Sequence, residues 1–408
     1  MEFLFSQTLK RSRENQNLSA EELSKNIKFT LKMYSEMESD KRYPNIFTLR
    51  KLANLLNTTT VNLLTGLDID VPLSKLELTS KEPFSLWYYK WMDVKSKEIT
   101  FTPVATYSSD AQYVLKAFRN KPLCSITWED VNNYIQSKTH LSKRTLRDHK
   151  TLIKLVYSFA KACKQYDYNP AIDIKIPKEA RKPAETKTIT AQSKKMIMEF
   201  EHEMQLPAVI MLLAGLRRGE LLTLTFGDIH LLDGYISVNK VTEMHNGVPY
   251  VVDRAKSEMG VRNVDIPNTL CSFILNYIGK HPEKKPTDLI ISNHFGKPLG
   301  ANGFQKKWND YIASMNLHYG NFTKSELKAI NSIDELPLHI ERFTSKQLRH
   351  TYATMLYFSK TDVLIAKEQL GHSSITTTLN FYCHMDRKYK RKNITLFDNF
   401  LSEEAFAG

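Results

Sequence analysis

Two proline-containing stretches divide this chain of 408 residues into three segments. One is Asp68–Thr79, and the other, Ile176–Pro183, holds a proline near each end. A residue before a proline is kept out of the helical conformation, so we interpret both stretches as linkers. Because domains commonly hold about 100–200 residues, we expect about two to four of them. We predict the domains 1–70, 80–176 and 184–408.

The sequence carries no signal of a membrane or of an oxidising compartment. Its longest apolar run, Pro207–Leu216, is far shorter than the roughly 18 residues of a membrane span. The first residues lack the apolar core of a signal peptide. The four cysteines lie far apart and form no CxxC pair, so neither a disulfide framework nor a zinc site is expected. We therefore expect a cytoplasmic protein with no membrane partner and no metal.

Positive charge is concentrated in the middle of the chain. The formal net charge is +13, from 57 basic and 44 acidic residues. Residues 71–182 hold 20 basic and 11 acidic side chains, a net of +9, against +1 for residues 1–70 and +3 for residues 183–408. Such an excess favours a phosphate-rich partner for the middle segment.

The middle segment is expected to form four helices, and the last of them, Ser142–Gln165, is the most informative. One face of it is an apolar stripe at helical spacing. Another face repeats basic residues, with Asp148 as the only acid between them, although like charges one turn apart repel. This favours binding to duplex DNA phosphates, with a solvated lysine face as the alternative. The basic residues are Lys143, Arg147, Lys150, Lys154, Lys161 and Lys164.

Capping residues mark short helices in the first segment. Ser19 followed by Glu22 forms a capping box, and Thr30 can cap the next helix. The run LSAEELSKNIKFTLKMYSEMESDKRYPNIFTLRKLANLLNTTTVNLL resembles the Cro/C1-type helix-turn-helix domain. Lys28 departs from the pattern, because a small residue often occupies that turn.

The resemblance implies that the second helix of the motif enters the major groove of DNA. A helical protein-interaction module is the alternative interpretation of this segment. The residues that the resemblance places near bases are Lys32, Met33 and Glu36, and those near phosphate are Lys41 and Arg42.

The third segment carries motifs in one fixed order. GLRRGE follows the buried run, Lys256 lies at a turn between two strand-like stretches, and L-R-H-T, L-G-H and T-x-x-x-Y-x-H come next. Singly, an Arg at a helix start forms a surface ion pair, a His after a Gly caps a helix, and a Tyr packs in a core. Together, over residues 184–395, they resemble the tyrosine recombinase (phage integrase) family, and the basic helical segment resembles its core-binding domain.

The resemblance implies a mainly α multidomain fold: a helix-turn-helix domain, a helical core-binding domain and an α-rich catalytic domain with a small antiparallel sheet. It also implies a role for each matched residue. Arg217 and Arg349 would clamp the phosphate, Lys256 would be the hairpin lysine, and Tyr382 would be the nucleophile. His372 would be the second histidine of the set, and Glu220 would orient the first arginine.

These residue types suit phosphodiester chemistry. Guanidinium groups stabilise the negative charge that builds on phosphate oxygens. A tyrosine stores the energy of the broken bond in a covalent 3′-phosphotyrosyl link, and Lys256 is the candidate acid for the leaving oxygen. Nothing in the sequence resembles an acidic metal cluster, so we expect activity without a cofactor.

One position departs from the family pattern H-x-L-R-H. Here the sequence reads Lys346-Gln347-Leu348-Arg349-His350, so a lysine replaces the first histidine. Lysine keeps a positive donor near the phosphate but is a poorer neutral base near pH 7. We interpret Lys346 as an active-site substitute, which leaves open which group accepts the proton of the tyrosine.

The family resemblance implies double-stranded recombination sites as partner and a homotetramer on two such sites. Accessory DNA-bending or directionality factors are possible further partners. The apolar tail residues Ile394, Leu396, Phe397, Phe400 and Leu401 would pack on a neighbouring protomer or on their own domain. Two other functions stay open: a DNA-binding regulator with a recombinase-like body, and a type IB topoisomerase-like relaxing enzyme.

Overall fold

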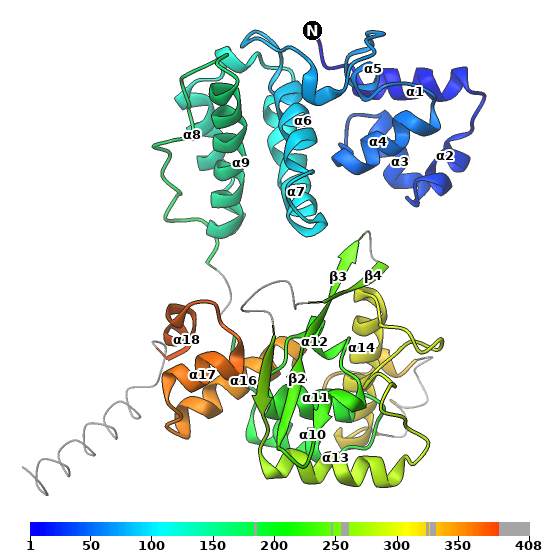
Figure 1. The fold of residues 1–408 in the computed structure, drawn as a ribbon, viewed down its shortest axis with the longest axis vertical. Helices are drawn as coiled ribbons and strands as arrows, with labels where there is room; N and C mark the ends of the chain where they lie inside the picture. Colours follow the sequence, from blue (N-terminus) through cyan, green and yellow to red (C-terminus); the bar gives the residue numbers. More distant parts are fainter. Residues whose placement is uncertain (183–185, 246–247, 254–260, 324–325, 327–331, 383–408) are drawn as a thin grey trace, which may run out of the picture. The chain divides into compact units, whose positions relative to one another are not determined.

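The computed structural model describes residues 1–182, 186–245, 248–253, 261–323, 326 and 332–382 (Figure 1). The chain divides into two compact units, residues 1–184 and 185–408. Both consist mainly of helices, and the described strands form small antiparallel sheets in the second unit. The predicted fold class is therefore confirmed. No helix in the described residues is long and apolar enough to cross a membrane.

Short helices with well-formed caps open the first unit. The Ser19 hydroxyl accepts the Glu22 amide and the Glu22 carboxylate accepts the Ser19 amide, so the predicted capping box is present. Thr30 caps the following helix as predicted. Lys28, between these two helices, has a φ of 61°, in the left-handed region that favours glycine. The helices are α1 (Phe5–Asn15), α2 (Ala20–Asn26), α3 (Leu31–Glu38), α4 (Ile46–Leu55) and α5 (Thr60–Thr65).

Longer helices complete the first unit where the sequence predicts them. The basic helix α9 begins at its Ser142 cap and ends at Ala162, slightly before the predicted end. Its buried face is part of one hydrophobic cluster that extends from Phe3 to Ile174. The other helices are α6 (Phe84–Lys95), α7 (Phe101–Phe118) and α8 (Trp128–Gln136), and α9 is Lys143–Ala162.

The stretch Asp68–Thr79, which we interpreted as a linker, is packed against the unit. Leu73, Leu76 and Leu78 are buried, and the Trp87 indole N–H donates to the Thr79 carbonyl at 3.1 Å. The three leucines explain this packing. The polar residues around them are the reason that the sequence suggested an exposed connection. Residues 1–70 and 80–176 therefore share one core, and the three-domain division stays a prediction.

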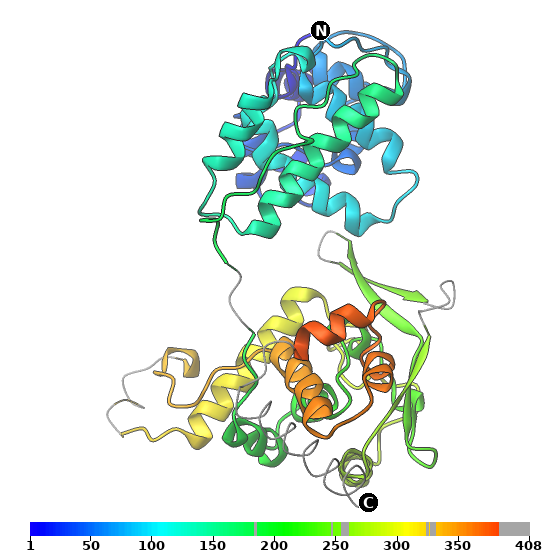
Figure 2. The same ribbon diagram turned by 90° about the vertical axis from the view of Figure 1, so that its left-hand side faces the viewer.

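Helices also form most of the second unit. An apolar helix, α11, lies in its core and leads to the segment that carries Arg217. The C-terminal helices, orange to red in Figure 2, pack on one another, and α17 also packs on strand β5 (Arg262–Asp265). These helices are α10 (Ala191–Glu199), α11 (Gln205–Leu213), α12 (Arg218–Leu221), α13 (Asn268–Lys280), α14 (Ala301–Tyr319), α16 (Ser345–Phe358), α17 (Val363–Leu370) and α18 (Ile375–Tyr382).

The described strands of the second unit form two separate sheets. In the first, β2 (Tyr235–Val238) pairs with β1 (Ile229–His230) on one side and β5 (Arg262–Asp265) on the other. The second is the hairpin of β3 (Lys240–His245) and β4 (Val248–Asp253). β3 and β4 thus belong to a sheet of their own, and β5 joins β2 through a contact that is distant in sequence.

Candidate active site

Arg217 lies where the chain leaves the buried helix α11. Gly215 makes the turn, with a φ of 64° that suits glycine, and a Cβ there would lie 2.2 Å from a ring atom of Tyr352. Arg217 then forms the N-cap of the short helix α12. The close packing of this turn fixes the backbone position from which the Arg217 side chain extends.

Glu220 connects two arginines from a fully buried position, with a side chain that is 0% exposed. Its carboxylate accepts the backbone amide of Arg217 at 2.8 Å and the Arg217 Nη1 at 3.0 Å. Both carboxylate oxygens also accept from Arg262, at 3.0 Å each. Burial raises the pKa of Glu220, but the hydrogen bonds and charges of Arg262 and Arg217 outweigh it and lower the pKa to about 2.

Three guanidinium groups bind successive carbonyl groups at the C-terminal end of α17. Arg262 Nε donates to Gln369 O at 3.4 Å, Arg349 Nη2 to Leu370 O, and Arg217 Nη2 to Gly371 O at 2.7 Å. The C-terminal end of a helix carries partial negative charge on its carbonyl groups. These carbonyls and Glu220 therefore hold three positive groups together. The three residues are Arg217, Arg262 and Arg349, and we name them the arginine cluster.

Arg349 is a partly buried member of the arginine cluster. It comes from α16 and also donates to the carbonyl of Gly215. Burial, followed by the charge of Arg217, lowers the pKa of Arg349 to about 9. The guanidinium group of Arg349 is therefore still charged near pH 7. An anion bound beside Arg349 and Arg217 would reduce the repulsion between them.

His372 directly follows the carbonyl groups that bind the arginines. Its Nδ1 lies 2.9 Å from the Thr378 hydroxyl on α18. Burial and the charges of Arg349, Arg217 and Arg262 lower the pKa of His372 to about 4. The imidazole is therefore neutral near pH 7. Tyr382 ends α18, one helical turn after Thr378, so the backbone of the predicted nucleophile belongs to the helix that contacts His372.

Of the two predicted catalytic lysines, the structure describes Lys346 but not Lys256. Lys346 is exposed on the first turn of α16, one turn before Arg349. Burial and the charge of Lys346 lower the pKa of His350. Lys256 lies outside the described residues, between β4 and β5. Of the predicted catalytic and supporting residues, the structure brings Arg217, Glu220, Arg349 and His372 together.

The sequence interpretation missed Arg262. A signal for it was present, because Arg262 lies two positions before the buried Val264 and therefore on the same face of a short strand. A charged residue on an inward face requires a buried partner, and here that partner is Glu220. The partner could not be identified in advance, because it lies in a helix 42 positions earlier.

The predicted DNA-binding residues are partly engaged with protein groups. On α3, Lys32 is exposed, whereas Glu36 accepts from Arg42 at 2.8 Å. On α9, Lys150 donates to the Ile174 carbonyl at 2.8 Å. Lys161 lies 3.6 Å from Asp167. The exposed basic residues of the first unit that remain on the predicted faces are Lys32, Lys41, Arg147, Lys154 and Lys164.

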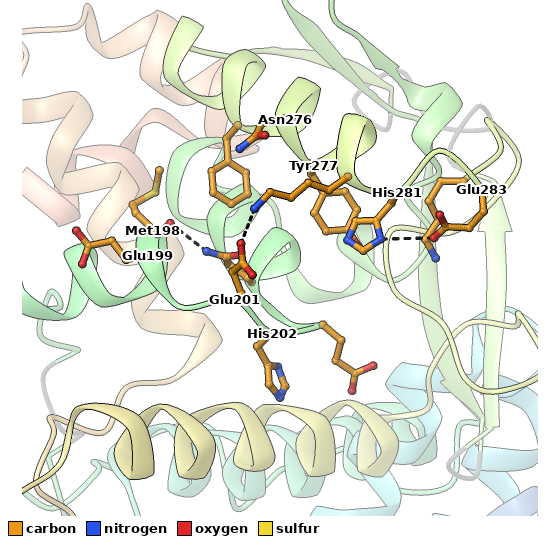
Figure 3. Close-up of a pocket in the computed structure, with 13 residues that line it drawn as sticks. Met198, Glu199, Glu201, His202, Asn276, Tyr277, His281 and Glu283 are labelled. Atoms are coloured by element: carbon orange, nitrogen blue, oxygen red, sulfur yellow. Dashed lines mark hydrogen bonds and ion pairs between the residues drawn. The ribbon is translucent and has the colours of Figure 1, made fainter.

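A cavity of about 640 Å³ lies elsewhere in the second unit, between the loop after α10 and α13 (Figure 3). Glu201 pairs with Lys280 there, and Glu283 lies 3.5 Å from His281. None of the predicted site residues lines this cavity. In the described part of the chain, no group of three or more His, Cys, Asp or Glu side chains could hold a metal ion.

Known protein families and proteins match parts of this sequence. The sequence model of the phage integrase family matches residues 182–388, and a helix-turn-helix model matches residues 9–63. Tyrosine recombinase XerD of Halalkalibacterium halodurans is 25% identical over 246 residues, which cover 59% of this chain and 70% of that protein. Transposase A from transposon Tn554 of Staphylococcus aureus is 26% identical over 211 residues, half of each chain.

Solved structures show a similar fold. The Tn1549 transposon integrase in complex with transposon right end DNA has a TM-score of 0.59 at 20% identity, and covers 77% of this chain and 98% of that one. The XerH site-specific recombinase bound to a palindromic difH substrate has a TM-score of 0.53 at 16% identity, covering 81% and 100%.

Proposed function

This chain belongs to the phage integrase family of tyrosine recombinases, and we propose that it is a site-specific DNA recombinase. It cleaves and rejoins DNA through a covalent 3′-phosphotyrosyl intermediate and thereby integrates or excises a mobile element. The observation that carries the proposal is the arginine cluster, which gathers Arg217 and Arg349 beside His372. The similarity to a transposase and to recombinases supports the same activity.

The arginine cluster suits an anion with several oxygens. Arg217 and Arg349 each donate to protein carbonyls or to Glu220 from part of the guanidinium group. A guanidinium carries further N–H groups, and these bind the nonbridging oxygens of the scissile phosphate. The charge that develops in the transition state is stabilised by groups that are already in position.

Covalent cleavage is a substitution at the phosphorus atom. The phenolate oxygen of Tyr382 forms the new bond to phosphorus, and the bond to the 5′-oxygen breaks. Lys256 supplies the proton that the leaving oxygen takes up. The imidazole of His372 is neutral near pH 7, because its pKa is lowered to about 4, but the same shift makes it a weak base. The negative charge of the bound phosphate raises this pKa, and His372 then accepts the tyrosine proton. Lys346 supplies a positive donor to the phosphate.

Double-stranded recombination sites are the proposed partner. The exposed residues of α9 bind the duplex backbone in the half-site, and α3 of the helix-turn-helix domain binds DNA as well. Four copies assemble on two sites and exchange strands, with accessory bending or directionality factors where the element supplies them. The chain acts in the cytoplasm at the nucleoid. The proposed domains remain 1–70, 80–176 and 184–408.

A covalent adduct tests the proposal most directly. The full chain is incubated with half-site suicide duplexes, and the protein–DNA adduct is measured after denaturation. We expect an adduct from the wild type and none from Tyr382→Phe. Tyr319→Phe is the matched control, since Tyr319 lies at the end of α14 and packs on Phe200.

The products identify the activity. Recombinants from two sites support a recombinase, relaxed plasmid without recombinants supports a topoisomerase-like enzyme, and DNA binding without an adduct supports a regulator. Cleavage should persist in EDTA, and cleavage that only Mg²⁺ restores would contradict a cofactor-free mechanism.

A further inference from the structure

An ion pair joins the helix-turn-helix domain to the helical segment behind it. Arg50 on α4 donates to Asp93 Oδ1 on α6 from Nη2 at 2.7 Å and from Nε at 3.1 Å. The side chain of Asp93 is only 9% exposed, and its other oxygen accepts the backbone amide of Ser74 at 3.0 Å. One carboxylate therefore holds α4, α6 and the connecting stretch together.

Backbone groups form a second junction between the same parts. The Gln112 amide on α7 accepts the Tyr43 N–H at 2.9 Å and donates to the Tyr43 carbonyl at 2.8 Å. The Tyr89 hydroxyl on α6 donates to the Pro44 carbonyl at 3.0 Å and is buried. These bonds fix the chain immediately after α3, because they hold its main chain instead of flexible side chains.

Aromatic packing completes the junction. Phe3 stacks on Tyr89 with ring centroids 6.1 Å apart, and Phe47 on α4 stacks on Phe101 of α7 at 5.5 Å. Leu73, Leu76 and Leu78 of the connecting stretch are buried in the same cluster. Domains move relative to one another unless their interface is large and hydrophobic, and this interface is continuous with the core of both parts.

We infer that the helix-turn-helix domain and the helical segment act as one rigid DNA-binding body. Figure 1 shows α3–α4 on one side of α6–α7 and α8–α9 on the other. A compact body of this length has a radius of gyration of roughly 16 Å and is thus about 40 Å across. At about 3.4 Å per base pair, the DNA contacts of α3 lie within about 12 base pairs of those of α9.

The inference rests on the proposed DNA binding by both elements and makes it specific. The partner of α3 is the duplex next to the core site, bound at a fixed distance and a fixed helical phase. A domain on a flexible tether could instead reach a separate site many helical turns away. Distance and phase therefore distinguish the two arrangements.

Footprinting of the full chain provides the first test. Duplexes are selected by the full chain from a randomised pool, and hydroxyl-radical protection is compared between the wild type and Lys32→Ala/Lys41→Ala. Both residues are exposed. We expect about tenfold weaker binding and loss of protection only within about 12 base pairs of the core segment. Lys10→Ala, an exposed position on α1, is the matched control and should leave the footprint unchanged.

Spacer insertion provides the second test. Five or ten base pairs are inserted between the core segment and the segment whose protection depends on Lys32 and Lys41. Because the body is rigid, both insertions should remove the second protected segment and lower the affinity to that of the double variant. Protection that persists at the shifted position would overturn the inference.

A third measurement examines the junction directly. Trypsin should leave the connecting stretch intact at the exposed Lys75 in the wild type and cut it in Arg50→Ala, with Arg50→Lys intermediate. Rapid cutting in the wild type would contradict a rigid junction. If the lysine variants alter no footprint, α3 does not bind DNA and the inference fails, whereas the adduct at Tyr382 would still support the recombinase.

Discussion

Replacing Arg262 by glutamine tests whether the arginine cluster depends on this residue. The change removes both hydrogen bonds that Arg262 donates to the buried carboxylate of Glu220. Removing one partner of a buried ion pair costs about 3–5 kcal/mol. The lowered pKa of Glu220, about 2 against an ordinary 4.5, corresponds to about 3 kcal/mol when converted at about 1.4 kcal/mol per unit. We therefore expect a loss of about 3 kcal/mol near pH 7.

The pH dependence of this loss follows from the sign of the pKa shift. A carboxylate with a lowered pKa stabilises the folded state above its ordinary pKa, and the stabilisation disappears as the pH falls through the folded value. The wild type should therefore lose its advantage over Arg262→Gln between pH 4.5 and about 2. Well below the folded pKa of about 2, Glu220 is protonated in both proteins and the difference vanishes.

Calorimetry measures the stability and adduct formation measures the activity. For a unit of this size, about 3 kcal/mol corresponds to a fall of about 6–12 °C in melting temperature. Cleavage should slow by about a hundredfold, because small displacements of a positioning group have effects of this order. Arg262→Lys should recover part of both quantities, since it restores the charge but cannot bind both oxygens.

Arg218→Gln is the control for Arg262→Gln. Arg218 is exposed beside Arg217 and packs over the ring of Phe304, so its removal should change stability by only about 0.5 kcal/mol. If Arg262→Gln melts and cleaves like this control, Arg262 does not support the cluster and the reasoning is refuted.

Three further changes test other parts of the site. Lys346→His should keep substantial adduct formation and lose rate above the ordinary histidine pKa of about 6.5, whereas complete inactivation would contradict the proposed role. Gly371→Ala should lower the melting temperature and slow cleavage, because Gly371 has a φ of 58° and a Cβ would lie 2.8 Å from Arg262 Cζ; Gly279→Ala, in an open helical position, is its control. Deleting residues 394–408 should impair tetramer assembly more than DNA binding, and intact tetramers on sizing columns would exclude docking on a neighbour.

Local signals in the sequence predicted local structure well. The Ser19–Glu22 capping box and the Thr30 cap are confirmed, since their partners lie only three positions away. The four helices of the middle segment are likewise confirmed, because an apolar stripe is a property of the segment itself. Sheet membership is less local, since β2 stops at Val238 and Lys240, two positions later, begins a strand of the other sheet.

Non-local contacts explain what the sequence did not reveal. Position-by-position resemblance predicted Arg217, Glu220, Arg349 and His372, and the structure brings these residues together. The packed connection at Leu73 escaped prediction, because its contacts come from distant helices. The tail residues and Lys256 lie outside the described residues, so their predicted roles remain proposals.

The arrangement at the end of α17 explains how a chain without bound DNA can hold positive charges together. Burial lowers the pKa of Arg349, and repulsion from the charge of Arg217 lowers it further. Glu220 offsets part of this repulsion. The carbonyl groups of Leu370 and Gly371 offset a further part of it without adding a titratable group. Neutral acceptors leave the cluster with net positive charge, whereas further carboxylates would have cancelled its attraction for phosphate. The incoming phosphate then relieves the remaining repulsion, so the strain in the free protein favours binding of the transition state.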